Sequence, residues 1–177
     1  MNDKKENQRV RLTKRLLKDA LVDLLLETPL QRITITQICS YAQINRTTFY
    51  KYYANECDLY ADLENDFIAV IAENLDSTPI EGVERLLALI QAYSKIAVVM
   101  INNSSEEKLS RRIFSLPEVR KDIHFKKIEK SEYSDEFLLF IFSGAYAVIK
   151  RWINNGFVQS PREMAAFLNR TIDKMMR

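Results

Sequence analysis

Apolar residues recur every three or four positions along most of the chain, which is the spacing of amphipathic α-helices. The first apolar face comprises Leu12, Leu16, Leu17, Ala20, Leu21, Leu24 and Leu25. Thr28-Pro29 ends this helix, because the residue before a proline is disfavoured in the helical conformation. Further helices are predicted over residues 35–41, 46–52, 56–75 and 134–155. Since no alternating strand pattern is sustained, we predict an all-α protein of about nine helices.

Capping sequences indicate where helices begin in the second half of the chain. Thr78-Pro79-Ile80-Glu81 and Ser160-Pro161-Arg162-Glu163 each combine a capping hydroxyl, a proline at the first helical position and a glutamate that can reach back. Residues 104–107 have the same box without proline, and Leu116-Pro117-Glu118 indicates another start. Asn154-Asn155-Gly156 predicts the end of the long apolar helix that precedes it.

Charge is unevenly distributed along the chain. The formal net charge is only +2, but the first 18 residues hold 7 basic and 2 acidic side chains. We therefore expect a polyanionic partner to meet the amino-terminal end. Because the start is polar and no stretch is apolar for long enough to cross a bilayer, we expect a cytoplasmic protein without a membrane partner.

The sequence lacks the motifs of common catalytic and metal sites. There is one histidine, His124, and no Gly-rich phosphate loop, Gly-x-Ser-x-Gly, His-Glu-x-x-His or Cys-x-x-Cys motif. We therefore predict that the protein is not an enzyme and holds no cofactor or metal. Both cysteines, Cys39 and Cys57, are expected to be reduced and buried.

Residues 33–53 have the pattern of a helix, a tight turn and a second helix. Asn45 is a good N-cap for the second helix, and a pair of this geometry is a helix-turn-helix. Phe49 and Tyr53 are expected to pack inward, with Tyr52 partly exposed. The outer faces of the two helices carry polar and basic side chains suited to base edges and phosphates, namely Thr34, Thr36, Arg46, Thr47, Tyr50 and Lys51.

This region resembles the DNA-binding domain of the TetR family of bacterial transcriptional regulators. The resemblance rests on the amphipathic first helix and on residues 33–38, 42–50, 52–53 and 58–59. It implies a three-helix DNA-binding domain over residues 1–59, with a basic leader over 1–11, and an all-α regulatory and dimerisation domain over 60–177. With Gln37 and Thr48 added from the same two helices, the candidate DNA-binding residues are Thr34, Thr36, Gln37, Arg46, Thr47, Thr48, Tyr50, Lys51 and Tyr52.

Two positions depart from the family pattern. Gln43 stands where the turn usually has a glycine, so a left-handed backbone there would cost on the order of 1 kcal/mol. Glu56 stands where the family usually has a lysine that contacts phosphate. DNA affinity is therefore expected to depend more on Arg46, Lys51 and the basic leader.

The second half carries two further candidate sites. Phe140, Gly144, Tyr146, Trp152-Ile153 and Gly156 resemble the carboxy-terminal domain of the TetR subgroup that includes the dihydroxyacetone-kinase activator. The family implies an effector cavity lined by aromatic residues, and the alternative is an ordinary core; the candidates are Tyr93, Phe114, Phe125, Phe140 and Tyr146. The apolar stripe of the last helix and the several apolar faces of the helix before it predict a dimer interface formed by Phe142, Tyr146, Met164, Phe167, Leu168, Ile172 and Met175.

Together these features predict a TetR-like regulator that binds a pseudo-palindromic DNA operator as a homodimer. The commoner outcome in the family is repression relieved by a small molecule or another signal. Two alternatives stay open. One is an activator of the same family, and the other is a helix-turn-helix scaffold that acts mainly through protein–protein interaction.

Overall fold

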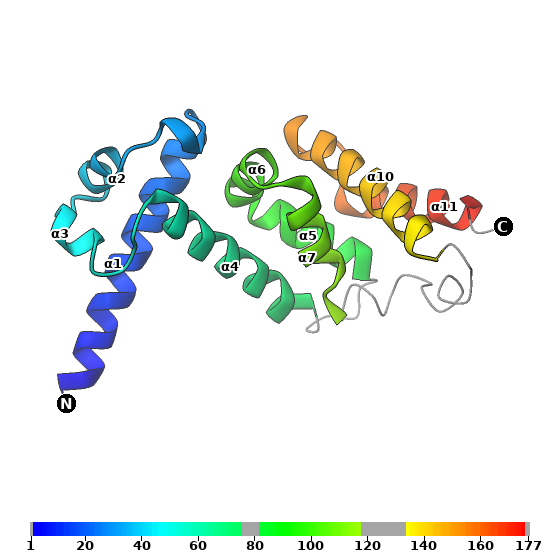
Figure 1. Ribbon diagram of the computed structural model, residues 1–177. Helices are drawn as coiled ribbons and strands as arrows, with labels where there is room; N and C mark the ends of the chain where they lie inside the picture. Colours follow the sequence, from blue (N-terminus) through cyan, green and yellow to red (C-terminus); the bar gives the residue numbers. More distant parts are fainter. Residues whose placement is uncertain (1, 76–81, 118–133, 176–177) are drawn as a thin grey trace. The chain divides into compact units, whose positions relative to one another are not determined.

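The computed structural model describes residues 2–75, 82–117 and 134–175, and the regular structure in these ranges is entirely helical (Figure 1). The predicted all-α class is confirmed, with nine α-helices and one 3-10 turn in the described ranges. The helices are α1 (Asn2–Leu25), α2 (Ile35–Ala42), α3 (Arg46–Phe49), α4 (Glu56–Leu75), α5 (Gly82–Ala92), α6 (Ser94–Asn103), α7 (Glu106–Phe114), α10 (Ser134–Asn154) and α11 (Pro161–Met175), and the 3-10 turn covers Leu30–Arg32.

The chain divides into two compact units, residues 1–67 and 68–177. The division falls within α4, whereas the sequence pattern placed the domain boundary after residue 59, in the first turn of the same helix. α4 begins and ends at the residues predicted from the sequence, Glu56 and Leu75.

The first unit is built on α1, which packs against α2, while α2 packs against α3. Its core joins Leu17 and Leu21 of α1 to Ile38 of α2 and Phe49 of α3, all of which are fully buried. Burying each such side chain stabilises the fold by about 1.5–3 kcal/mol. α1 therefore supports α2 directly, and α2 in turn supports α3, so that the two short helices with the candidate DNA-binding residues are anchored on the long one.

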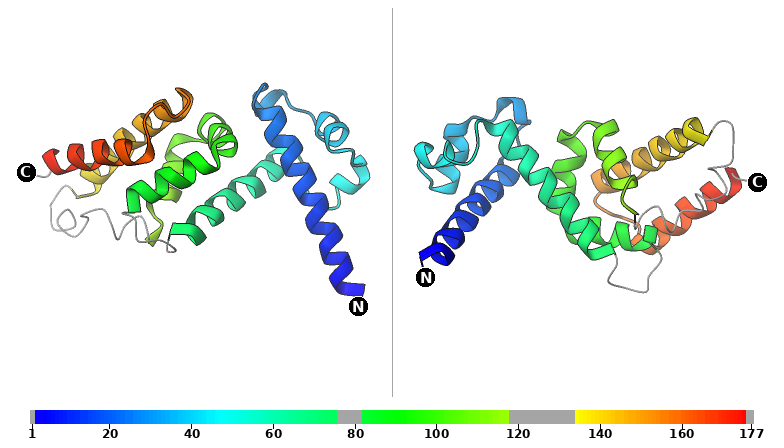
Figure 2. Two further views of the ribbon diagram at one scale, coloured as in Figure 1. Left: turned by 180° about the vertical axis from the view of Figure 1, so that it is seen from behind. Right: turned by 60° about the horizontal axis from the view of Figure 1, so that its bottom comes forward.

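The amino-terminal part of α1 differs in two ways from the predicted first helix, whose apolar face begins at Leu12 after the basic leader. The basic leader is helical from Asn2 and continuous with α1, and its turns extend past α2 and α3 (Figures 1 and 2). Leu12 and Leu16 are exposed rather than buried. The reason is that the apolar arc of α1 is wider than the surface that the neighbouring helices cover, and these two leucines lie at its edge.

The second helix of the motif is shorter than predicted. α3 ends at Phe49, although hydrogen-bonded turns continue to Tyr53, whose amide donates to the Phe49 carbonyl at 3.1 Å. Tyr50 has a ψ of −11°, which tightens the backbone and ends the regular α-helical hydrogen bonding.

In the second unit α11 lies along α5, and α10 packs on α6 and α7 (Figure 2). Leu87, Met100, Leu109 and Trp152, each from a different helix, are fully buried. Among the described residues, no single helix is long and apolar enough to cross a membrane. Only α5 and α6 taken together reach that length, and they are bent by 97° at the break between them.

The connection between α10 and α11 is fixed by its own contacts. Gly156 ends α10 with a φ of +76°, as predicted, and Phe157 follows with a φ of +59°. The Phe157 ring meets Trp152 edge to face at 4.9 Å, and the Trp152 indole N–H donates to the Gln159 carbonyl at 2.8 Å. Since a non-glycine residue in the left-handed region is strained, this ring contact offsets part of that cost.

The predicted helix starts have different outcomes. Ser160 and Glu163 form the predicted capping box, and hydrogen bonds from Ser160 lower the pKa of the Glu163 carboxyl. α7 begins at Glu106, so its N-cap is Ser105 and not Ser104, and Ser105 makes no side-chain capping bond. The box predicted over 78–81 includes residues outside the described part of the chain, and so do the helix start predicted at Leu116-Pro117-Glu118 and His124.

Candidate DNA-binding surface and regulatory unit

A capping box holds the amino end of α2. The Thr34 hydroxyl accepts a hydrogen bond from the Gln37 amide at 3.2 Å, and the Gln37 side-chain oxygen accepts from the Thr34 amide at 2.8 Å. Two of the candidate DNA-binding residues therefore have a structural role that the sequence analysis did not assign to them. Both side chains remain exposed, as does Thr36 beside them.

The turn between α2 and α3 depends on Gln43. Its φ and ψ are 55° and 38°, so the residue has the left-handed conformation that the glycine-like position of the turn requires. The following amide, of Ile44, donates to the Cys39 carbonyl at 2.9 Å. This arrangement is a helix C-cap in which glycine is the usual residue, and the expected conformation is confirmed.

Asn45 caps α3 as predicted. Its side-chain oxygen accepts hydrogen bonds from the Thr47 amide at 2.9 Å and from the Thr47 hydroxyl at 2.8 Å. One turn along, the Arg46 guanidinium donates to the Tyr50 hydroxyl at 3.4 Å. These contacts orient three candidate DNA-binding side chains, those of Arg46, Thr47 and Tyr50.

The inner and outer faces of α3 and its following turns are clearly separated. Phe49 and Tyr53 are buried, with ring centroids 5.7 Å apart, and Tyr50 is half exposed, as expected. The exposed candidates are Arg46, Thr47, Tyr50 and Lys51, while Thr48 and Tyr52 are partly exposed. The structure thus brings the candidates of α3 to one outer face.

A polar cluster lies behind this face, and we refer to Lys14, Lys18, Tyr53, Asp62 and Asp66 as the Asp62 cluster. The Tyr53 hydroxyl donates to Asp62 Oδ2 at 2.7 Å, and Lys18 Nζ lies 2.9 Å from the same oxygen. Lys18 also contacts Asp66, and Lys14 lies 3.7 Å from Asp62. Two lysines of the basic amino-terminal segment therefore pair with carboxylates of α4.

The first turn of α4 is acidic and exposed. Asn55 caps the Asp58 amide at 2.9 Å, and the Asp58 carboxylate accepts from the Ala54 amide at 3.1 Å. Glu56 is partly exposed here, where a carboxylate favours the helix amino terminus. Cys57 is exposed, so the expectation that both cysteines are buried is wrong for Cys57 and confirmed for Cys39. Cys57 lies in the first turn of α4, and its side chain is on the exposed side of that helix.

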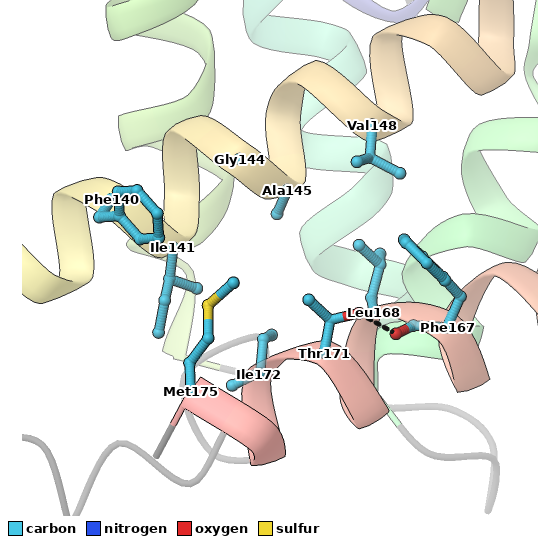
Figure 3. A pocket seen from close by; sticks show the side chains of 10 residues that line it. All are labelled: Phe140, Ile141, Gly144, Ala145, Val148, Phe167, Leu168, Thr171, Ile172 and Met175. Carbon is cyan, nitrogen blue, oxygen red and sulfur yellow. Dashed lines mark hydrogen bonds between the residues drawn. The ribbon is translucent and has the colours of Figure 1, made fainter. Parts of the chain in front are cut away.

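An apolar groove of about 190 Å³ runs between α10 and α11 in the second unit (Figure 3). Ile141 and Ala145 point from α10 toward Thr171 and Ile172 of α11. The Thr171 hydroxyl is bonded to the Phe167 carbonyl of its own helix at 2.8 Å, so it adds little polarity to the groove. The lining is completed by Phe140, Gly144, Val148, Phe167, Leu168 and Met175.

Of the four effector-cavity candidates that the structure describes, only Phe140 lines this groove. Tyr93 is exposed between α5 and α6. Phe114 and Tyr146 are buried, and Phe125 lies outside the described residues. The Tyr146 hydroxyl is buried and makes no hydrogen bond within the described part of the chain. Its burial, with the charge of Glu106 adding to the effect, raises the pKa of Tyr146 to about 12.

The seven candidates for a dimer interface lie in three different environments. Four of them line the groove: Phe167, Leu168, Ile172 and Met175. Met164 is buried in the second unit. Phe142 and Tyr146 lie on another face of α10, and the ring of Phe142 stacks on Phe114 of α7 with centroids 4.5 Å apart.

The Asp62 cluster was missed by the sequence analysis. The signal that could have revealed it is the spacing of Asp62 and Asp66, four residues apart on α4, opposite Lys14 and Lys18, four apart on α1. Among the residues with a described position, no three His, Cys, Asp or Glu side chains gather as metal ligands.

Comparisons of sequence agree with this architecture. A TetR-type family profile described as "Transcriptional regulator C-terminal region" matches residues 77–174. The chain is 30% identical over 134 residues to the HTH-type dhaKLM operon transcriptional activator DhaS of Lactococcus lactis, covering 68% of this chain and 70% of that protein. It is 22% identical to the uncharacterised HTH-type transcriptional regulator YxbF of Bacillus subtilis, covering 84% of this chain but 42% of YxbF.

Solved structures share the fold. A TetR transcriptional regulator from Streptococcus agalactiae 2603V superposes with a TM-score of 0.72 at 17% identity, covering 94% of this chain and 97% of that one. The dihydroxyacetone kinase operon activator DhaS superposes with a TM-score of 0.59 at 17% identity, covering 93% and 96%. With the profile match over the second unit and the relative that covers two thirds of the chain, these findings show that the protein belongs to the TetR family of transcriptional regulators.

Proposed function

We propose that this protein regulates transcription by binding a pseudo-palindromic DNA operator as a homodimer. The observation that carries the proposal is the outer face of α3 and its following turns, where Arg46, Thr47, Tyr50 and Lys51 are exposed together. Arg46 can contact a guanine edge in the major groove, while Lys51 and the Tyr50 hydroxyl suit phosphates. The buried Phe49 and Tyr53 fix this face on the first unit.

The amino-terminal helix extends the basic surface. Arg9 and Arg11 are exposed on the part of α1 that precedes the packed core. Lys14 and Lys18 pair with Asp62, so we assign the phosphate attraction of this segment to the residues before them. Such contacts add affinity for DNA of any sequence and weaken with salt.

A second copy of the chain is the proposed occupant of the groove between α10 and α11. The groove is apolar along its length, and Phe167 and Met175 expose large hydrophobic side chains at it. Two copies related by a two-fold axis would pair these helices into a four-helix interface. The same axis is needed to place two recognition helices in major grooves about 34 Å apart.

The signal that controls binding is proposed to act on the second unit. The feature that supports a small polar effector there is the buried Tyr146 hydroxyl, which has no hydrogen-bond partner among the described residues, since a buried polar group is costly unless it is satisfied. Repression is our main assignment for the direction of control. Activation is the second candidate, and it is favoured by the name of the relative DhaS, a transcriptional activator.

The test begins with DNA selected from a random duplex pool and with the DNA that flanks the protein's own gene. Anisotropy should detect a duplex that the protein prefers over scrambled sequence, with two protomers bound per site. Arg46→Ala should reduce that preference by relaxing it at one base pair, and Arg151→Ala, at an exposed position of α10, serves as the control of equal charge change. If the protein prefers no duplex and captures a protein partner instead, the scaffold alternative is favoured. Glu56 also supports that alternative, because it stands where the family usually has a lysine that contacts phosphate.

A further inference from the structure

The Asp62 cluster joins three segments that determine where the recognition helix lies. Tyr53 closes the hydrogen-bonded turns that follow α3, Lys18 comes from the middle of α1, and Asp62 comes from α4. A single oxygen, Asp62 Oδ2, accepts from the Tyr53 hydroxyl at 2.7 Å and lies 2.9 Å from Lys18 Nζ. All three segments belong to the first compact unit.

Tyr53 is coupled closely to α3. Its amide donates to the Phe49 carbonyl, and its ring packs against the ring of Phe49, which is fully buried. Lys14 Nζ lies 5.3 Å from the centroid of the Tyr53 ring, on which a cation is attracted by the ring electrons. Any shift of Tyr53 relative to α4 therefore displaces the exposed face of α3.

The cluster is balanced in charge and partly shielded from water. Lys18 keeps only 12% of its side chain exposed and Asp62 keeps 31%, while two lysines face two aspartates. Burial acts to raise the pKa of Asp62, but hydrogen bonds from Tyr53 and Lys18 and the charges of Lys18 and Lys14 outweigh it and hold the pKa below its ordinary value. A hydrogen bond to an ionised, partly buried acceptor is stronger than one between neutral groups.

We infer that Asp62 is a positioning residue for DNA recognition, which fixes the α3 face by accepting the Tyr53 hydroxyl while held by Lys18. The inference rests on the proposed DNA-binding function. Neither the Tyr53 hydroxyl nor Asp62 is on the exposed face, so their effect on DNA passes through the orientation of α3. When the hydrogen bond is lost, the binding-competent orientation is populated less, and the apparent affinity falls by the same factor.

The variants are chosen to separate positioning from charge. Tyr53→Phe removes one hydroxyl and keeps the buried ring. Asp62→Ala removes the acceptor. Asp66→Asn is the matched control, because it removes one negative charge and one partner of Lys18, but Asp66 is not the carboxylate to which the Tyr53 hydroxyl donates. Circular dichroism and thermal midpoints establish that each variant is folded before binding is measured.

The expected result is a specific pattern of coupling. Tyr53→Phe should weaken binding to the preferred duplex about tenfold, the scale of one hydrogen bond to a charged group, and leave binding to scrambled duplex unchanged. The same tenfold loss should appear in the Asp66→Asn background and disappear in the Asp62→Ala background. If the cluster only stabilised the fold, Tyr53→Phe would instead lower the thermal midpoint without changing the ratio of specific to non-specific affinity.

Two results would overturn the inference. One is wild-type affinity in Tyr53→Phe. The other is an equal loss in the Asp62→Ala background, which would show that the hydroxyl acts independently of Asp62. If the wild-type protein prefers no duplex, the proposed DNA-binding function is wrong. Amide hydrogen exchange then tests separately whether Asp62 positions α3. Faster exchange of the 48–53 amides in both Tyr53→Phe and Asp62→Ala, but not in Asp66→Asn, would support the positioning role, and unchanged exchange would refute it.

Discussion

Phe114 of α7 and Phe142 of α10 stack with centroids 4.5 Å apart and ring planes within 8° of parallel. This contact places Phe142 inside the second unit, although its position in an apolar run suggested a role between protomers. We predict that Phe142→Ala lowers the free energy of unfolding by about 2 kcal/mol, less than for a fully buried phenylalanine because the ring is partly exposed. Chemical denaturation would measure this loss, and the oligomeric state of the folded variant should match the wild type.

Phe167 is the complementary case on α11. It is 48% exposed and lines the groove, so a charge there costs little in an isolated chain but would be buried in a dimer. We predict that Phe167→Glu produces folded monomers that have lost operator affinity. Sedimentation measures the mass, and Asp173→Lys, at an exposed position of α11 outside the groove lining, is the control. A Phe167→Glu dimer with full DNA affinity would disprove the interface.

These two phenylalanines show how much of the structure of the second unit can be predicted from the sequence. Period and capping residues predict the limits of α10 and α11, because those signals are local. They do not tell which apolar face meets a neighbour in the same chain, since Phe140, Ile141 and Phe142 are consecutive and equally hydrophobic. The packing of α7 on α10 determines which face of α10 is covered, and this packing depends on contacts between residues that are distant in the sequence.

In the first unit the local signals are stronger, and the candidate site follows from them more fully. The Asn45 cap, the buried Phe49 and the exposed Arg46 are all predicted from spacing and confirmed. The Asp62 cluster was not predicted, because Lys18 and Asp62 lie far apart in the chain and each resembles an ordinary surface charge.

The turn residue Gln43 offers a test of backbone strain. A non-glycine residue in the left-handed region costs about 1–2 kcal/mol, while glycine costs about 0.5–1 kcal/mol in unfolded-chain entropy. Because Gln43 has a φ of 55° and an exposed side chain, we predict that Gln43→Gly stabilises the protein by about 0.5–1 kcal/mol. Gln43→Ala, which keeps the strain, should show no such gain in thermal or urea unfolding. A loss of stability in Gln43→Gly would contradict the strain argument.

Arg46 and Lys51 should differ in what they contribute to DNA binding. Arg46→Ala should cost about 1–3 kcal/mol on the preferred duplex and relax the preference at one base pair, as expected of a bidentate contact to guanine. Lys51→Ala should weaken binding to all duplexes and make the dependence on salt shallower by about one phosphate contact. Anisotropy titrations at several salt concentrations on a set of single-base operator variants separate the two. Similar effects of both substitutions on every duplex would show that Arg46 reads no base.

Acid should weaken the first unit through Asp62. The pKa of this carboxyl in the folded protein lies below its ordinary value of 3.8, which means that the folded state favours the ionised form. The group therefore contributes stability above about pH 3.8, and that contribution is lost as the pH falls through the lower, folded pKa. Unfolding by urea at a series of pH values should show wild type more stable than Asp62→Asn at neutral pH, with the difference shrinking below pH 3.8. Tyr53→Phe should leave a smaller difference over the same range, since it removes one of the hydrogen bonds that lower the pKa. The difference in the free energy of unfolding between wild type and Asp62→Asn could instead stay constant into acid. That result would show that Asp62 titrates alike in the folded and unfolded states, and that Tyr53 and Lys18 do not stabilise its charged form.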